Sequence, residues 1–163
     1  MSRYESERFV PATPSCVKSK LSLKFDGRKL YLNIHDYSNR VIEYTAVSGK
    51  PVKGGFDYSI QRQKQAFHGP IPSGEYWITL SELWKNAWYR PGSDNAWGDY
   101  RVAIHPYPTT KTYGRGGFFI HGGAIPGSAG CIDLTKNMNR FIKHLRTLMP
   151  GKKDCYIPLT VEY

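Results

Sequence analysis

The sequence lacks several features that define large classes of protein. No apolar run approaches the roughly 20 residues that a membrane-spanning helix needs. The three cysteines include no Cys-x-x-Cys pair, so neither a zinc ribbon nor a thioredoxin-type redox motif is supported. No internal repeat, coiled-coil period or block of five or six like charges is present. We therefore expect no membrane span, and a basic nucleic-acid-binding arm is unsupported.

The N-terminus also lacks a feature that would direct the chain to the secretory pathway. The first 20 residues contain no apolar stretch of the kind found in signal peptides. We expect synthesis in a cytoplasm, so a role outside it requires another export route. Residues 1–18 are polar, contain two prolines and predict an N-terminal arm. Residues 19–163 predict a single domain.

The charge and the aromatic content bound the class of protein. Aromatic residues make up 14% of the chain, which excludes a disordered protein. The 23 Lys and Arg residues against 13 Asp and Glu residues give a net charge of +10. Such a surface attracts polyanions, among them nucleic acid, anionic lipid and a carboxylate-rich wall polymer. A merely soluble basic surface explains the charge equally well.

Alternating apolar and polar residues predict a strand-dominated domain. Two such runs flank Asp26-Gly27 and predict a hairpin of Leu21–Phe25 and Lys29–Ile34. Further strands are predicted over residues 40–47, 75–80, 99–105, 118–121 and 155–163. In the last of these, Pro158 predicts a sheet edge or a bulge.

One segment has clear helical spacing. Apolar residues recur at that spacing over 134–149, with Asp133 as the expected N-cap and Pro150-Gly151 after the end. Residues 58–68 stay unassigned. Residues 81–98 predict an irregular aromatic loop or a short helix around Trp84, Trp88 and Trp97.

A glycine-rich stretch over 116–134 carries the candidate chemistry. His121 ends a predicted buried strand, and Cys131 follows ten residues later, just before the predicted helix. A thiol is only a few per cent thiolate at neutral pH, and a nearby imidazole or a helix N-terminus favours the thiolate. Glycine at position 130 allows close approach to the backbone, where the amides of Gly130 and Cys131 would face a developing oxyanion. The alternative is a buried cysteine and a core histidine in a glycine-rich turn.

These residues resemble the active-site signature of the YkuD-type L,D-transpeptidases. The matching letters are HGG at 121–123 and GSAGCIDL at 127–134. Residues 46–50 and 72–76 resemble two further segments of that family, in the same order. Ala129 departs from the usual histidine, Asp133 departs from the usual Arg or Asn, and the spacer is short. With these departures, the chain looks closer to the L,D-transpeptidase-like toxins that type VI secretion systems deliver.

The resemblance implies a mainly β, sandwich- or barrel-like catalytic fold with one main C-terminal helix. It implies Cys131 as nucleophile and His121 as base, acting between the third residue of a peptidoglycan stem and its terminal D-Ala. A backbone carbonyl, that of Gly122 or Gly123, would orient the histidine. Substrate-binding candidates are Arg115, Ser128, Gly130, Gly122 and Gly123. No cofactor and no metal are expected.

The resemblance also implies partners and a place of action. These are peptidoglycan stem peptides, a periplasmic immunity protein and the spike or tube components of the secretion machine, with action in the periplasm of a target bacterium. No nucleic acid is expected as a partner. Cys16 and Cys155 are candidates for a disulfide because Cys131 has the catalytic role, and three reduced thiols are equally compatible. Two other functions remain open, a housekeeping or phage wall enzyme and a non-enzymatic polyanion-binding module.

Overall fold

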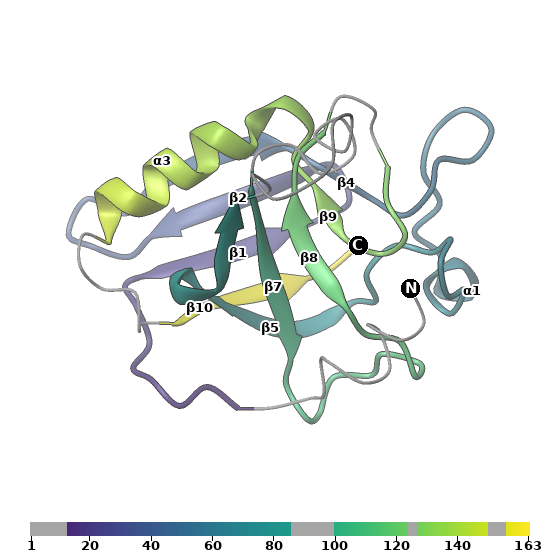
Figure 1. Cartoon of the computed structure of the whole chain (residues 1–163), viewed down its shortest axis with the longest axis horizontal. Helices are drawn as coiled ribbons and strands as arrows, with labels where there is room; N and C mark the ends of the chain where they lie inside the picture. Colours follow the sequence, from purple (N-terminus) through teal and green to yellow (C-terminus); the bar gives the residue numbers. More distant parts are fainter. Residues whose placement is uncertain (1–12, 86–99, 124–126, 150–155) are drawn as a thin grey trace.

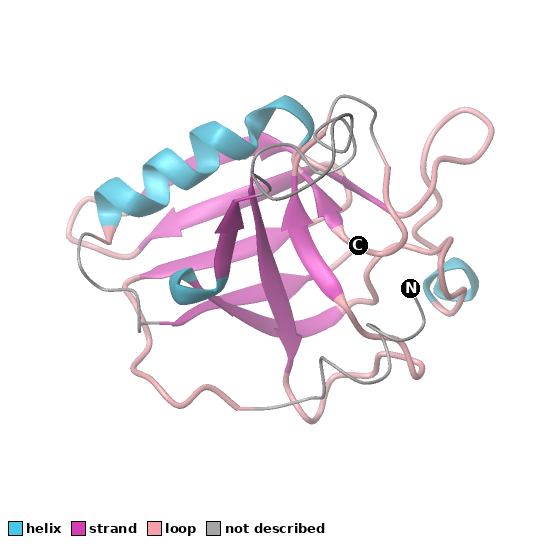
Figure 2. Ribbon diagram, viewed as in Figure 1, coloured by secondary structure: helices cyan, strands magenta, loops and turns pink. Residues whose placement is uncertain are grey.

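Strands dominate the computed structural model, which describes residues 13–85, 100–123, 127–149 and 156–163 (Figure 2). The strands are β1 (Leu21–Phe25), β2 (Lys29–Ile34), β3 (Arg40–Thr45), β4 (Val47–Ser48), β5 (Gly74–Thr79), β6 (Leu83–Lys85), β7 (Tyr100–Pro106), β8 (Phe118–His121), β9 (Ile132–Asp133) and β10 (Tyr156–Val161). The helices are α1 (Ile60–Gln63) and α3 (Met138–Leu148), with 3-10 turns η2 (Leu80–Glu82) and η4 (Thr135–Asn137).

The strands form one strongly curved sheet. Its order is β3-β2-β1-β10-β5-β7-β8-β9-β4, and β6 pairs with β7 beside this path (Figure 1). The two ends of that order, β3 and β4, are separated in the chain by Ala46 alone. The sheet therefore curls almost into a barrel. This architecture confirms the predicted mainly β, barrel-like fold with one main C-terminal helix.

The first hairpin shows how local chemistry fixes the start of the sheet. The Asp26 carboxylate accepts hydrogen bonds from the N–H groups of Arg28 and Lys29, both at 2.9 Å. Gly27 has φ +92°, a conformation that glycine adopts without steric cost. The turn therefore sets the antiparallel register of β1 against β2, in which Leu23 faces Leu32.

Alternation along the strands divides the sheet into two faces. On β7, β8 and β9 the even-numbered residues lie in the main core, among them Val102, Ile104, Phe118, Ile120 and Ile132. A separate small cluster on the opposite face contains Ala103, Phe119 and Cys131. Because successive side chains of a strand point to opposite faces, the odd-numbered residues here share a face away from the main core.

The helix begins later than its sequence pattern predicts. Residues Ile132–Asp133 form β9 and residues Thr135–Asn137 form the 3-10 turn η4, so α3 starts only at Met138. Asp133 is therefore not the N-cap of this helix, and the helix does not start beside Cys131. Pairing of β9 with β8 and β4 takes these residues out of the helix. The apolar side of α3 packs on the core as expected, through Met138, Phe141, Ile142 and Leu145.

The strand that contains Pro158 lies inside the sheet rather than at an edge. β10 runs parallel to β1 and antiparallel to β5, so Pro158 faces Trp77 in the middle of the sheet. The expectation of an edge position is wrong, because burial of Ile157, Leu159 and Val161 outweighs the one donor that proline lacks.

Several predicted features lie at the limits of the described residues. At the end of the predicted arm, Lys18 forms a bridge with Tyr156, and Ser19 N–H donates to the Tyr156 carbonyl at 2.9 Å. The predicted strand 40–47 is divided at Ala46 into β3 and β4. Trp88, Trp97 and Cys155 lie outside the described residues, and with them the predicted disulfide. Among the described residues, no helix has the length and apolar character to cross a membrane.

Candidate functional site

The candidate site lies on three neighbouring strands whose register aligns its side chains. Arg101 of β7 faces His121 of β8, and His121 faces Asp133 of β9. All three residues have odd numbers and therefore lie on the face opposite the main core. His121 is 4% exposed and Asp133 is fully buried. The sheet itself thus brings an imidazole and a carboxyl group together.

Cys131 joins this group from the residue before β9. It lies two positions from Asp133 and is packed with Ala103 and Phe119 on the same face. Cys131 is 6% exposed. The structure therefore places Cys131, His121 and Asp133 on one face of the sheet. A shared face is necessary for Cys131 and His121 to act together, as the sequence predicts.

The turn before Cys131 is held by hydrogen bonds from Ser128. Its hydroxyl donates to the Cys131 carbonyl at 2.7 Å, and its N–H donates to the Gly49 carbonyl at 3.0 Å. These contacts give Ser128 a turn-shaping role, and its binding of substrate stays a prediction. Gly130 has φ +116°, and a Cβ there would lie 2.5 Å from Nη2 of Arg115. Glycine at 130 is thus required by the turn itself.

His121 has two polar neighbours at Nδ1. This atom lies 3.0 Å from the Gly122 carbonyl oxygen and 4.0 Å from Oδ1 of Asp133. A carbonyl only accepts hydrogen bonds, so in the neutral imidazole Nδ1 carries the proton and Nε2 is the basic nitrogen. The Gly122 carbonyl therefore has the geometry that we expect of a glycine carbonyl that orients this ring.

Asp133 is itself fixed by the backbone. Its Oδ2 accepts from Gly127 N–H and its Oδ1 accepts from Thr135 N–H, both at 2.8 Å. The sequence analysis used Asp133 as a helix cap and as a departure from a family pattern, and missed its place beside His121. The Cys131-x-Asp133 spacing could have shown it, because residues two apart in a strand share a face.

Burial governs protonation in this pair. It lowers the pKa of His121 below its ordinary 6.5, and nearby Arg101 acts in the same direction. The Asp133 carboxylate and the Gly122 carbonyl partly oppose this lowering. Burial also raises the pKa of Asp133 above its ordinary 3.8, against the effects of His121 and the two backbone donors. The neutral imidazole is consequently the favoured form of His121 near neutral pH, and that form accepts a proton.

Gly122, directly after His121, does not border open space. A Cβ on Gly122 would lie 2.7 Å from Cβ of Met138 and 2.8 Å from the Thr135 carbonyl oxygen. Gly123 N–H donates to that same carbonyl at 3.1 Å. Gly122 therefore permits close packing of β8 against the start of the helix. Substrate binding by Gly122 and Gly123 stays a prediction.

Arg115 lies in the interior. Its Nη1 donates to the carbonyls of Gln63 (2.6 Å) and Pro70 (2.7 Å), and its Nη2 donates to the Gly69 carbonyl at 3.0 Å. The guanidinium also contacts the Phe118 ring at 5.7 Å. This geometry favours a structural role, in which Arg115 ties the segment after α1 to the turn at Gly130, over the predicted binding of a substrate carboxylate.

We expect Arg115→Met to lower the free energy of unfolding by about 3 kcal/mol, because three buried carbonyl groups lose their donor. Urea unfolding followed by circular dichroism measures this change. Lys111→Met provides the matched control, since Lys111 is exposed and its Nζ lies 5.6 Å from the centroid of the Tyr113 ring. A loss below 1 kcal/mol in Arg115→Met would contradict the structural role.

A second polar cluster continues the same face toward β5. His105 of β7 lies 2.6 Å from Oε1 of Glu82 and stacks on the Trp77 ring with 4.5 Å between centroids. Thr79 donates to the same Glu82 oxygen at 3.1 Å. Among the described residues, no group of three His, Cys, Asp or Glu side chains is arranged to hold a metal ion.

Comparison with known proteins identifies the family. No curated protein is matched by this sequence. The Tlde1 domain matches residues 44–156, which is more than half of the chain and includes His121, Cys131 and Asp133. This family consists of L,D-transpeptidase-like effectors of type VI secretion systems, which agrees with the resemblance seen in the sequence. The chain therefore belongs to the Tlde1 domain family of type VI effectors.

Proposed function

We propose that this effector is a cysteine enzyme that cleaves the tetrapeptide stem of peptidoglycan between its third residue and the terminal D-Ala. The outcome is L,D-carboxypeptidase activity with water and exchange with a free D-amino acid. Membership of an L,D-transpeptidase-like effector family supports enzymatic action on the cell wall. The observation that carries the specific reaction is the shared face of Cys131, His121 and Asp133.

The first half of the reaction forms an acyl-enzyme. Nε2 of His121 accepts the thiol proton of Cys131, and Sγ attacks the carbonyl carbon of the third stem residue. The tetrahedral oxyanion then collapses, the C–N bond to D-Ala breaks, and His121 returns its proton to the leaving amine. The products are free D-Ala and a thioester on Cys131.

Asp133 positions the base during these steps. As His121 gains its proton, the imidazolium is stabilised by the Asp133 carboxylate, whose nearest oxygen lies 4.0 Å from Nδ1. The Gly122 carbonyl holds the Nδ1 proton in place at 3.0 Å. The two contacts keep the ring in one orientation through both proton transfers.

The second half resolves the thioester. Water gives the shortened tripeptide stem and free Cys131, with His121 accepting and then returning one proton. A D-amino acid amine gives an exchanged stem, and the amine of a second stem gives a cross-link. Each route breaks the same C–S bond.

The effector family also supports the place and the partners of this reaction. We propose that the protein reaches the periplasm of a target bacterium through the spike or tube of the secretion machine. An immunity protein in that compartment would protect kin cells. A housekeeping role fits an effector family less well.

The test is incubation of the full chain with soluble disaccharide-tetrapeptide, followed by mass spectrometry of the products. We expect loss of one D-Ala from the substrate, and its replacement when another free D-amino acid is added. Prior alkylation of the protein's thiols should stop both reactions. If folded, unalkylated protein leaves the tetrapeptide intact and produces no tripeptide, the result would count against this function.

A further inference from the structure

The outer side of α3 carries a row of positive charge. Lys136 of η4 is followed by Arg140, Lys143 and Arg146, at intervals of four, three and three residues, and all four are exposed. This spacing places them along one side of the helix, opposite the side that packs on the core. We call these four residues the basic ridge.

No acidic side chain neutralises the ridge from within the helix, since residues 134–149 contain neither Asp nor Glu. None of the four residues forms an ion pair within the part of the chain that the structure describes. The shared sign of these charges produces a positive potential along the whole helix.

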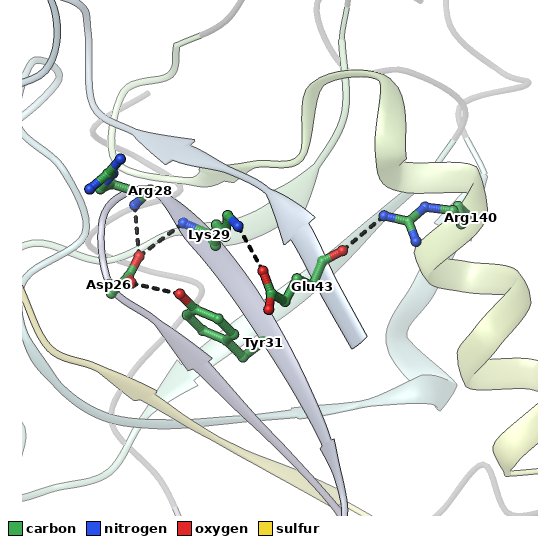
Figure 3. A network of polar contacts seen from close by, with 6 residues as sticks. All are labelled: Asp26, Arg28, Lys29, Tyr31, Glu43 and Arg140. Atoms are coloured by element: carbon green, nitrogen blue, oxygen red, sulfur yellow. Dashed lines mark hydrogen bonds and ion pairs between the residues drawn. The ribbon is translucent and has the colours of Figure 1, made fainter. Parts of the chain in front are cut away.

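Glu43 of β3 contacts the ridge, but its carboxylate is already paired with another cation (Figure 3). Glu43 binds Lys29 through its carboxylate at 2.7 Å, while its backbone carbonyl accepts from Arg140 at 2.9 Å. Arg140 also lies 4.5 Å from the centroid of the Tyr44 ring. These contacts hold the Arg140 side chain in place and leave its charge uncompensated by Glu43.

One end of the ridge lies near the candidate site, because Leu134 N–H donates to the His121 carbonyl at 2.7 Å and Gly123 N–H donates to the Thr135 carbonyl at 3.1 Å. Lys136 lies three residues after Asp133, and α3 then runs along the side of the sheet (Figure 1). Its 11 residues correspond to about 16 Å at a rise of 1.5 Å per residue. A ligand whose reacting bond lies at Cys131 therefore meets the far end of the ridge only if it extends well beyond that bond.

We propose that the basic ridge binds the anionic polymer around the cleaved stem, through carboxylates of neighbouring stem peptides in the same wall. This inference rests on the proposed function, because it takes peptidoglycan as the substrate. The polymer carries carboxylates at repeating intervals, which suits four cations repeated along a helix. An acidic protein would account for the charge but not for the position of one end of the ridge near the site.

The test compares polymeric with small substrate. In the ridge variant, Lys136→Gln, Lys143→Gln and Arg146→Gln remove three charges and retain Arg140 with its packing contacts. The control variant, Lys18→Gln, Lys20→Gln and Lys24→Gln, removes three charges from exposed positions away from α3. We expect the ridge variant to bind isolated, insoluble sacculi on the order of tenfold more weakly in a pelleting assay at low salt. Raising the salt to about 0.5 M should abolish the difference because exposed charges are then screened.

Two readouts separate this inference from the proposed function. Release of D-Ala from soluble disaccharide-tetrapeptide should be the same in wild type, ridge variant and control variant, while release from sacculi should fall only in the ridge variant. Equal sacculus binding in all three proteins would overturn the inference, as would equal losses in the ridge and control variants. Loss of turnover on both substrates would overturn it too. Absence of turnover in the wild type would count against the proposed cleavage of stem peptides. The pelleting comparison would still show whether the ridge binds sacculi.

Discussion

Cys131→Ala should reduce D-Ala release from the tetrapeptide substrate by at least about 1,000-fold, because no acyl-enzyme forms without the thiol. His121→Gln should cause a loss of similar size, since the thiol then has no neighbouring base. Steady-state release of D-Ala measures both effects, and intact-protein mass spectrometry should detect a stem-peptide adduct on the wild type alone.

The matched control for this experiment is Cys16→Ala. Cys16 lies in the segment before β1 and outside the candidate site, so its replacement should leave turnover within about twofold of wild type. Circular dichroism should show that all three variants keep the β-rich spectrum. Turnover that survives in folded Cys131→Ala would rule out a Cys131 acyl-enzyme.

Asp133→Asn should lower kcat/KM by roughly 100-fold while the protein stays folded. The amide keeps the shape of the side chain and can still accept from one backbone donor, but it removes the charge that stabilises the imidazolium. The Gly122 carbonyl still contacts Nδ1 at 3.0 Å, which is why we expect a smaller loss than for His121→Gln.

The pH dependence gives this prediction a second readout. The pKa of His121 lies below 6.5, so activity should fall only as the pH drops through that lowered value and the base becomes protonated. Asp133 raises the pKa of His121 toward its ordinary value. In Asp133→Asn the acidic limb of kcat/KM should therefore move to still lower pH.

A purely structural role for Asp133 makes a different prediction. The Asp133 carboxylate accepts hydrogen bonds from Gly127 and Thr135, and loss of those bonds alone would reduce stability without displacing the acidic limb. Thermal unfolding measured alongside the pH profile distinguishes the two. An unchanged limb combined with a lower melting temperature would restrict Asp133 to holding the turn.

The strands were largely predictable because their signals are local. Alternation and the Asp26-Gly27 turn predicted β1 and β2 with the bounds that the structure has, and β8 was predicted equally well. The pairing of Cys131 with His121 stays a prediction from glycine-rich surroundings and a resemblance, and the structure places both residues on one face of the sheet. Each of these inferences uses residues close together in the sequence.

The errors arose where distant residues decide the structure. Asp133 was interpreted as a helix cap because its pairing with His121 depends on the parallel contact of β9 with β8. The buried hydrogen bonds of Arg115 were missed as well, because its partners Gln63, Gly69 and Pro70 come from a segment some 50 residues away in sequence. Pro158 was placed at an edge because nothing near it in the sequence reveals that β10 lies between β1 and β5.

The central position of β10 has a consequence for how the protein folds. β1 pairs with β10, although the two strands lie at opposite ends of the described sequence. Until β10 arrives, β1 and β5 each present an edge without a partner, and exposed edges invite aggregation. Closure of the sheet depends on contacts between distant parts of the sequence, which slows folding.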